Sequence, residues 1–192
     1  MTKILPILFI LLWSSAFITS KVIVENATPF ASLTFRFIIV SFGFLIILLY
    51  FKEKLFIKIN YFLEACVSGI LFHGIYLGGV FYSISLGLPA NIAALIVSLQ
   101  PILTNIFAGP ILKEQVTWIQ WLGIALGFTG TILVLGFDIG KSISIISLIA
   151  CIAALLAVTI ATLWQKILSN KLTLIVNNFY QALGASIFLF FI

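Results

Sequence analysis

Charged residues divide the chain into long apolar stretches, and each stretch has the length of a membrane-spanning helix. A bilayer core needs about 20 mostly apolar residues per helix. Cutting the chain at its charge clusters and turn residues gives seven such segments, at residues 4–20, 30–51, 65–86, 89–112, 118–137, 142–165 and 172–192. Arg36 is the one Lys, Arg, Asp or Glu inside them. The sequence therefore predicts an all-α polytopic membrane protein with seven transmembrane helices.

The composition excludes several classes of soluble protein. Of the 192 residues, 63% are apolar and 8% are charged, whereas soluble domains contain about 45–50% apolar and about 25% charged residues. Two cysteines are too few for a secreted disulfide scaffold. A net charge of +5 would suggest nucleic-acid binding in a soluble protein, but the loop positions of the basic residues explain it as a topology signal. We expect a lipid bilayer as the surroundings and no nucleic-acid partner.

The basic residues predict the orientation of the spans. With a cytoplasmic N-terminus, two lysines, Lys21 and Lys141, fall outside, and seven fall in cytoplasmic segments. The seven are Lys3, Lys52, Lys54, Lys58, Lys113, Lys166 and Lys171. Cytoplasmic loops of membrane proteins carry an excess of Lys and Arg. We therefore expect a multi-pass protein of the bacterial inner membrane with its N-terminus in the cytoplasm.

Local signals predict helix starts and helix contacts. Thr28-Pro29 combines an N-cap hydroxyl with proline at the first helical position, and Thr117 with Gln120 is typical of a capping box. Small residues four positions apart let helix backbones touch in lipid. They are Gly74 and Gly78, Gly123 and Gly127, and Ala153, Ala157 and Ala161. This pattern favours burial of the third, fifth and sixth helices, unless it only reflects how common Gly and Ala are in such helices.

Arg36 lies about six residues into the second predicted helix, roughly 9 Å deep at a rise of about 1.5 Å per residue. Two interpretations stay open for its side chain. It reaches the outer interface and pairs with Glu25, or it faces a cavity and holds an anionic group.

His73 lies at the centre of the third predicted helix. Gly69, His73, Tyr76, Val80 and Ser83 share one face at three-to-four-residue spacing, and this stripe is a candidate lining of an aqueous path. Histidine titrates near neutral pH, so His73 is a candidate proton carrier or hydrogen-bond partner of a substrate. The alternative is a neutral histidine bonded to the backbone of a neighbouring helix.

The fourth predicted helix combines a polar face with prolines. Asn91, Ser98 and Asn105 recur every seven residues, and Gln100 shares an adjoining face with Thr104. Pro101 removes a backbone hydrogen bond in mid-membrane, which is tolerated where the backbone faces protein or a water-lined cavity. An interrupted helix near the midplane indicates a transport site, and a plain kink that shapes packing is the alternative.

The sequence lacks the side-chain patterns of an enzyme. It has no pair of embedded carboxylates, no His/Cys ligand cluster, no glycine-rich phosphate loop and no second histidine. We therefore expect a protein that is not an enzyme and that carries no metal or cofactor.

Two parts of the chain are weakly similar to each other. A shift of 145 residues without gaps pairs Ser14 with Thr159, Ala16 with Ala161, Lys21 with Lys166, Arg36 with Gln181, and Ser41 with Ser186. A unit of five spans is odd-numbered, so its second copy must enter the membrane upside down, and the basic loops fit that inversion.

Short motifs along the whole chain resemble the EamA-type transporters of the drug/metabolite transporter superfamily. The opening of the repeat is represented by Leu12-Trp13-Ser14-Ser15-Ala16-Phe17, Lys21, Pro29 and Arg36-Phe37. Its end is represented by Pro89-Ala90, Ala93-Ala94-Leu95, Pro101, Leu112-Lys113-Glu114, Gln120 and Gly123. The 142–181 stretch is similar to the start of the second repeat.

The resemblance implies a ten-helix fold of two inverted five-helix repeats with the substrate bound centrally between them. Residues 1–138 would form the first repeat and residues 139–192 the start of the second, with its last three helices lacking. Either the chain is a fragment, or its working unit needs a homo-oligomer or a complementing half. Glu114 would have a structural role at the cytoplasmic end of the fourth helix.

We expect a transporter that moves a small organic metabolite or drug-like solute by alternating access, with export of amino acids or related metabolites as one case. The candidate solute-binding residues are Trp13 as an aromatic wall, Ser14, Tyr76, Asn91, Ser98 and Gln100 as hydrogen-bonding groups, and Arg36 and His73 as charge partners. The alternative is a non-transporting membrane subunit or remnant that assembles with a partner chain.

Overall fold

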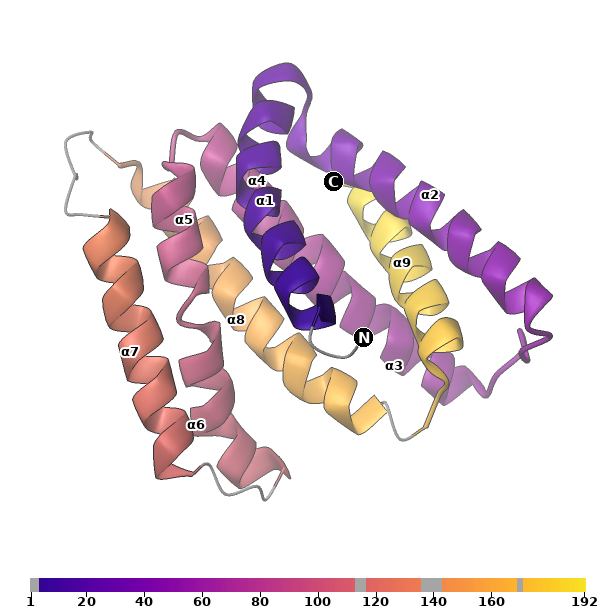
Figure 1. The fold of residues 1–192 in the computed structure, drawn as a ribbon. Helices are drawn as coiled ribbons and strands as arrows, with labels where there is room; N and C mark the ends of the chain where they lie inside the picture. Colours follow the sequence, from indigo (N-terminus) through magenta and orange to yellow (C-terminus); the bar gives the residue numbers. More distant parts are fainter. Residues whose placement is uncertain (1–3, 113–116, 136–142, 169–170) are drawn as a thin grey trace.

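The computed structural model describes residues 4–112, 117–135, 143–168 and 171–192, which form seven helical rods (Figure 1). The single-element rods are α1 (Ile4–Asn26), α2 (Pro29–Tyr50), α7 (Trp118–Leu135), α8 (Ile145–Leu168) and α9 (Leu174–Phe190). The third rod joins α3 (Ile59–Gly69), the π-helix η1 (Ile70–Leu77) and α4 (Gly78–Ser85), and another joins α5 (Ala90–Val97) to α6 (Gln100–Leu112). Each predicted span corresponds to one rod, so the predicted all-α fold is confirmed.

Several rods have the length and apolarity that a bilayer crossing requires. Four of them in the described chain meet both criteria, namely Pro29–Tyr50, Ile59–Ser85, Ala90–Ile111 and Ile145–Leu168. The shorter Leu174–Phe190 is also apolar. Together these helices make the protein a multi-pass membrane protein.

Three helices extend beyond the predicted spans into charged sequence, one of them α8, which continues to Leu168 and carries Lys166. α1 continues to Asn26 and carries Lys21 and Glu25, and α3 begins at Ile59 and carries Glu64. The prediction ended the spans at charged residues, but a helix keeps its backbone hydrogen bonds where it leaves the hydrocarbon. Four residues used in the sequence analysis, namely Lys3, Lys113, Glu114 and Lys141, lie outside the described residues.

The two predicted helix starts differ in how they are capped. Gln120 Oε1 accepts hydrogen bonds from Thr117 N at 2.8 Å and from Thr117 Oγ1 at 3.0 Å, which confirms the capping box of α7. α2 begins at Pro29 as predicted, with Thr28 in the extended conformation, but the Thr28 side chain makes no cap hydrogen bond. Proline fixes this helix start without the hydroxyl.

α9 lies at the centre of the packing, although it comes last in the chain. Its residues Ala182 and Ala185 share a core with Leu33 and Phe37 of α2, and a second core joins its Tyr180 to residues of α2, α3 and α8. In Figure 1, α9 (yellow) runs beside α2. A third core unites η1, α4, α5 and α8.

Small residues mark the closest helix contacts in the third rod but not in α7. A methyl group added at Gly184 of α9 would lie 2.9 Å from Cα of Cys66, and one added at Gly79 would lie 3.0 Å from the Ala150 carbonyl oxygen of α8. By contrast, a methyl group at Gly123 would meet none of the described atoms within 4 Å. The prediction that the fifth helix is buried was therefore wrong, because its small residues face away from the neighbouring rods.

The remaining predicted small-residue positions divide between contact and exposure. Gly74 faces the Phe188 ring of α9, and Ala157 and Ala161 of α8 are buried, whereas Ala153 is exposed. The third and sixth predicted helices are thus packed inside the bundle through most of these positions.

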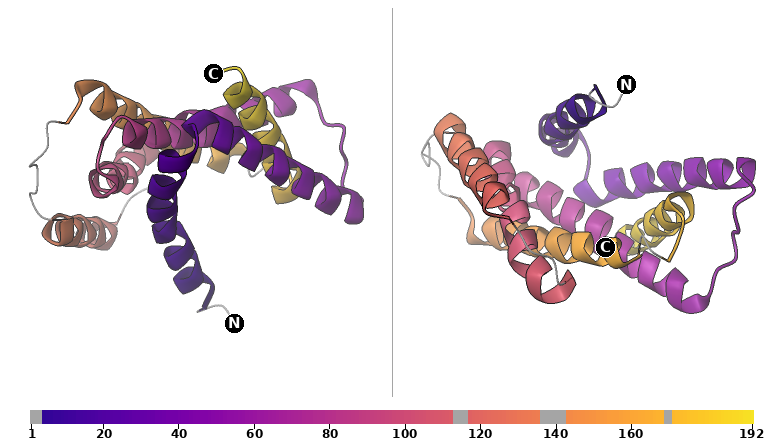
Figure 2. Two further views of the ribbon diagram at one scale, coloured as in Figure 1. Left: turned by 90° about the horizontal axis from the view of Figure 1, so that it is seen from above. Right: turned by 60° about the horizontal axis from the view of Figure 1, so that its bottom comes forward.

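α1 diverges from the other rods toward its N-terminus. Figure 2 shows its N-terminal half projecting away from the layer that the other helices form. Its packed residues, Phe17, Ile23 and Val24, lie in the C-terminal half, whereas Ile4 to Leu12 include many exposed apolar side chains. The space between α1 and the layer is where the candidate site lies.

Candidate functional site

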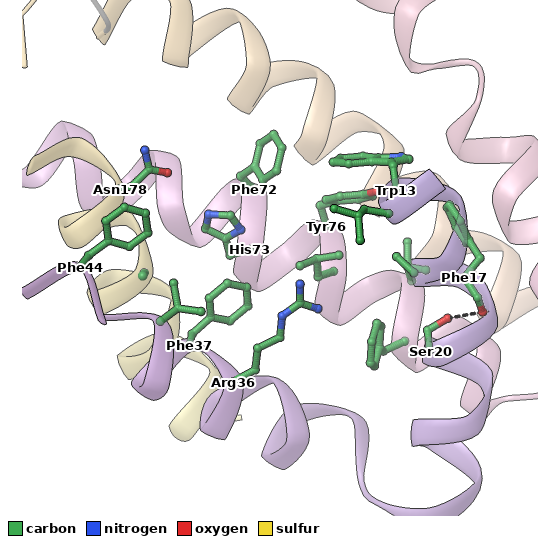
Figure 3. A pocket seen from close by; sticks show the side chains of 17 residues that line it. Trp13, Phe17, Ser20, Arg36, Phe37, Phe44, Phe72, His73, Tyr76 and Asn178 are labelled. Atoms are coloured by element: carbon green, nitrogen blue, oxygen red, sulfur yellow. Dashed lines mark hydrogen bonds between the residues drawn. The ribbon is translucent and has the colours of Figure 1, made fainter. Parts of the chain in front are cut away.

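A cavity of about 380 Å³ lies between α1, α2, the third rod and α9 (Figure 3). Its size falls within the range of small-molecule sites, which are about 300–1,000 Å³. Each of these elements contributes residues near the middle of its length, so the cavity lies well inside the apolar part of the molecule.

Aromatic side chains are the largest group in the cavity wall. The seven are Trp13, Phe17, Phe37, Phe44, Phe72, Tyr76 and Phe81. A mostly apolar wall with a few placed polar groups is typical of sites that bind small organic molecules. The polar lining residues are Ser20, Arg36, His73, Tyr76 and Asn178.

Arg36 points its guanidinium group into the middle of the cavity, as Figure 3 shows. Its Cζ atom lies 5.7 Å from the centroid of the Phe37 ring. Among the described residues Arg36 forms no ion pair, and Glu25 lines a separate hollow with Lys21. Arg36 therefore faces a cavity and does not pair with Glu25 in the structure.

His73 is held between two aromatic rings of the wall. Its ring centroid lies 4.7 Å from that of Phe37 and 5.0 Å from that of Phe72. Its Nδ1 atom is buried and has no hydrogen-bond partner within the described ranges. His73 therefore does not bond to a neighbouring backbone through its Nδ1 atom in the structure.

The π-helix η1 aligns the third rod with the cavity. The lining residues of this rod recur every four positions, as Phe72, Tyr76 and Val80 and as His73, Leu77 and Phe81. An α-helix has about 3.6 residues per turn, so the wider turns of η1 keep these residues in line. π-Helical segments occur frequently at functional sites.

The predicted stripe on the third rod is only partly correct. His73, Tyr76 and Val80 line the cavity, but Gly69 packs against the backbone of Gln181, and Ser83 is buried with its hydroxyl donating to the Val80 carbonyl at 2.7 Å. The prediction assumed α-helical spacing throughout, and η1 changes that spacing.

Four predicted site residues, Trp13, Arg36, His73 and Tyr76, meet around the cavity, and the other four lie away from it. Ser14 is exposed on α1, and Asn91 lines the hollow beside Lys21 and Glu25. The helix is interrupted between α5 and α6 as predicted, but Ser98 there donates to its own helix, to the Leu95 carbonyl at 2.7 Å.

Gln100 connects the interrupted helix to α8. Its Nε2 atom lies 3.3 Å from Thr104 Oγ1 and 3.2 Å from Thr162 Oγ1. The break between α5 and α6 therefore faces α8, and it does not open into the cavity. Gln100 was a candidate for solute binding because it is polar. The sequence does not show that the hydroxyl group of Thr162, on another helix, is the hydrogen-bond partner of its amide group.

Among the lining residues that the sequence analysis missed are Ser20, Phe44 and Asn178. Asn178 belongs to α9, and it donates from Nδ2 to the Leu174 carbonyl at 2.8 Å, which leaves its Oδ1 atom as an acceptor. Ser20 likewise donates to the Phe17 carbonyl at 2.8 Å. The four-residue spacing of Arg36, Val40 and Phe44 on α2 is a sequence signal for Phe44, whereas the packing of α9 against α2 has no such signal.

The cavity is suited to binding. No three His, Cys, Asp or Glu residues approach one another closely enough to hold a metal ion in the described part of the chain. The lining combines one cationic group, an imidazole whose Nδ1 atom has no partner among the described residues, hydroxyl groups and an amide oxygen with aromatic rings. Such a set orients a small organic molecule by hydrogen bonds and ring contacts.

Comparisons with known proteins give a family. Residues 2–136 match the EamA-like transporter family. The chain is 25% identical over 191 residues to the uncharacterized transporter YvbV of Bacillus subtilis (strain 168), a match that covers 98% of this chain and 61% of that protein. No solved structure matches the chain. The chain belongs to the EamA-like transporter family, as an all-helical, multi-pass membrane protein.

Proposed function

We propose that this protein moves a small organic solute across a membrane by alternating access, and that the solute binds in the cavity between α1, α2, the third rod and α9. The observation that carries the proposal is the aromatic cavity with Arg36 and His73 in its lining, in a chain of a transporter family. Transporters of this type bind their substrate near the bilayer midplane and expose it to each side in turn.

The packing of α1 supports a gating role for this helix. Its cavity residues Leu12 and Trp13 lie on the half that diverges from the other rods, Ala16 lies next to the middle of the helix, and all three are exposed. A helix held through one end can move at its other end at a small cost in packing energy. Movement of this half toward α2 would close the cavity on one side.

The proposed binding residues are those that line the cavity. Arg36 and His73 supply polar contacts, Trp13 forms an aromatic wall, and Tyr76 and Asn178 add a hydroxyl group and an amide oxygen. The proposed setting is the bacterial inner membrane with a cytoplasmic N-terminus, because seven of the nine lysines then face the cytoplasm. A homo-oligomer or a complementing half remains part of the proposal for the working unit.

Filling the cavity tests the proposal directly. Ala16 lines the cavity and is exposed, so Ala16→Trp occupies the space without disturbing a core. Ala125, which is exposed on α7, gives the matched control Ala125→Trp. The full chain in proteoliposomes is assayed with a panel of radiolabelled organic solutes, and bound solutes are found by thermal stabilisation.

We expect Ala16→Trp to abolish uptake and solute-dependent stabilisation, while Ala125→Trp keeps both. Equal transport by the two variants would contradict the proposed site. A stable complex with an unrelated protein, together with no response to any solute, would favour the alternative of a non-transporting membrane subunit.

A further inference from the structure

The cavity contains one charged residue and no residue of opposite charge. Of its described lining residues, Arg36 is the only Lys, Arg, Asp or Glu. Of the described acids on the neighbouring helices, Glu25 lines the separate hollow and Glu64 pairs with Lys171 at 2.8 Å. The positive charge of the cavity is therefore uncompensated by the lining.

Arg36 carries its charge well inside the length of α2, and its side chain is exposed at the cavity. Arg36 lies seven residues beyond the start of α2 at Pro29, which corresponds to roughly 10 Å along the helix. Ser20, six residues before the end of α1 at Asn26, lines the cavity at a similar level. Charged residues at such depths pair with a counter-charge or mark a solute pathway.

A carboxylate is the ligand group that best fits this arginine. The guanidinium has five N–H donors in a planar fork and accepts no hydrogen bond. It binds a carboxylate through two parallel, charge-assisted hydrogen bonds, which strengthen where water is excluded. The group points into the cavity in Figure 3, so a bound anion is reachable without rearrangement of α2.

The rest of the cavity does not favour an ammonium group. The side-chain oxygens that line it are neutral, namely the Asn178 amide oxygen and the hydroxyl groups of Ser20 and Tyr76. Figure 3 places Asn178 beside Phe44, at the end of the cavity away from Trp13 and Ser20. An ammonium group buried here loses its hydration without gaining an ion pair.

We propose that the preferred solute is an amphipathic organic monoanion, whose carboxylate binds Arg36 and whose apolar body lies against Trp13, Phe37 and Phe72. This inference rests on the proposed function and deepens it, because it selects an anion over a zwitterion or a cation. The aromatic wall accommodates a ring-sized apolar body by stacking and edge contacts.

Three solutes with one phenylpropyl skeleton test this preference. They are 3-phenylpropanoate, phenylalanine and 3-phenylpropylamine, which are an anion, a zwitterion and a cation. Binding to the purified full chain is measured by titration calorimetry, and transport is measured in proteoliposomes. We expect the anion to bind at least about tenfold more tightly than the zwitterion, and the cation to bind most weakly.

Variants of Arg36 assign the preference to its charge. Arg36→Gln is expected to lower anion affinity by about 10- to 100-fold and to remove the preference. Arg36→Lys keeps the charge but loses the planar fork, so it is expected to keep the preference at reduced affinity. Lys21→Gln removes a cationic residue outside the cavity and is the matched control.

The outcomes separate the inference from the proposed function. Equal or tighter binding of phenylalanine or the amine, a preference that survives Arg36→Gln, or no binding of any of the three would overturn the anion preference. In each of these cases the Ala16→Trp experiment still decides the proposed function. Tight anion binding without uptake would leave the preference standing and contradict transport.

Discussion

His73 has a buried Nδ1 atom with no hydrogen-bond partner among the described residues. Leaving a buried polar atom unpaired costs about 1–3 kcal/mol. The histidine is held by ring contacts with Phe37 and Phe72 instead. Polar residues inside a membrane that carry such a cost are typical of functional sites.

Replacing His73 with phenylalanine is expected to stabilise the fold and weaken the function. His73→Phe keeps the two ring contacts and removes the unpaired nitrogen, so we expect a gain of about 1 kcal/mol in unfolding free energy. Solute affinity is expected to fall about tenfold. Thermal unfolding in detergent and solute titration measure the two effects.

Tyr82→Phe is the matched control for this change. Tyr82 is exposed, stacks on Phe30 at 5.7 Å and is not part of the cavity wall. Tyr82→Phe is expected to change neither the unfolding free energy nor the solute affinity. A His73→Phe variant with lower stability and unchanged affinity would contradict a binding role for the imidazole.

The sequence identifies part of the cavity because polar groups are rare inside spans. Arg36 and His73 attract attention as costly residues, and both line the cavity. The same rule selected Gln100, which is satisfied by Thr162 of α8, and it missed Asn178 of α9. Side-chain packing decides which helices contact one another, and a single sequence carries little information on these contacts.

The contact between α3 and α9 depends on glycines. A methyl group added at Gly69 would overlap the backbone of Gln181, and one added at Gly184 would lie 2.9 Å from Cα of Cys66. Backbones that approach so closely cannot give way as flexible side chains do. This contact holds α9 in place as one wall of the cavity.

Gly69→Ala is expected to destabilise the protein by about 3 kcal/mol, because overpacking forces the two backbones apart. Gly123→Ala on α7 is the matched control. Its methyl group meets no described atom within 4 Å, so helix propensity predicts a gain of about 0.5–1 kcal/mol. Thermal unfolding in one detergent compares the variants, and equal stability would contradict the described α3–α9 contact.

The interruption between α5 and α6 lies directly before a proline. Pro101 has no N–H group to donate to the Val97 carbonyl, and the chain turns through Ser98 and Leu99. Pro101→Ala is expected to join α5 and α6, and hydrogen exchange would slow at residues 99–102. Pro29→Ala, at a helix start where no N–H is needed, should leave exchange unchanged. Fast exchange in Pro101→Ala would show that packing against α8 maintains the break.

The arrangement of the seven rods was only partly predictable. Apolar runs of about 20 residues indicate the spans because lipid offers no hydrogen bonds to an unfolded backbone. Basic loops indicate an orientation. Neither signal tells that α9 packs between α2 and the third rod, or that α7 lies at the edge, since lipid-facing and protein-facing residues are both apolar.

Cysteine labelling tests the orientation of the whole molecule. Ala27 lies in the turn between α1 and α2, and Phe56 lies in the α2–α3 connection and is 92% exposed. With a cytoplasmic N-terminus, Ala27→Cys should react with a membrane-impermeant maleimide in intact cells, and Phe56→Cys only after permeabilisation. The unmodified chain is the blank, because Cys66 and Cys151 lie inside helices. Reversed labelling would show the opposite orientation.

The π-helical segment has a consequence for how lengths vary among related chains. Each i→i+5 ring of η1 holds one more residue than an α-helical ring. Deleting one residue between 70 and 77 lets the third rod close as an ordinary α-helix without breaking the span. An insertion or deletion elsewhere in a packed span turns every following side chain by about 100°. We expect related chains to differ by a single-residue deletion at 70–77. A change of length there disturbs the packing of this membrane span less than a change elsewhere in the span.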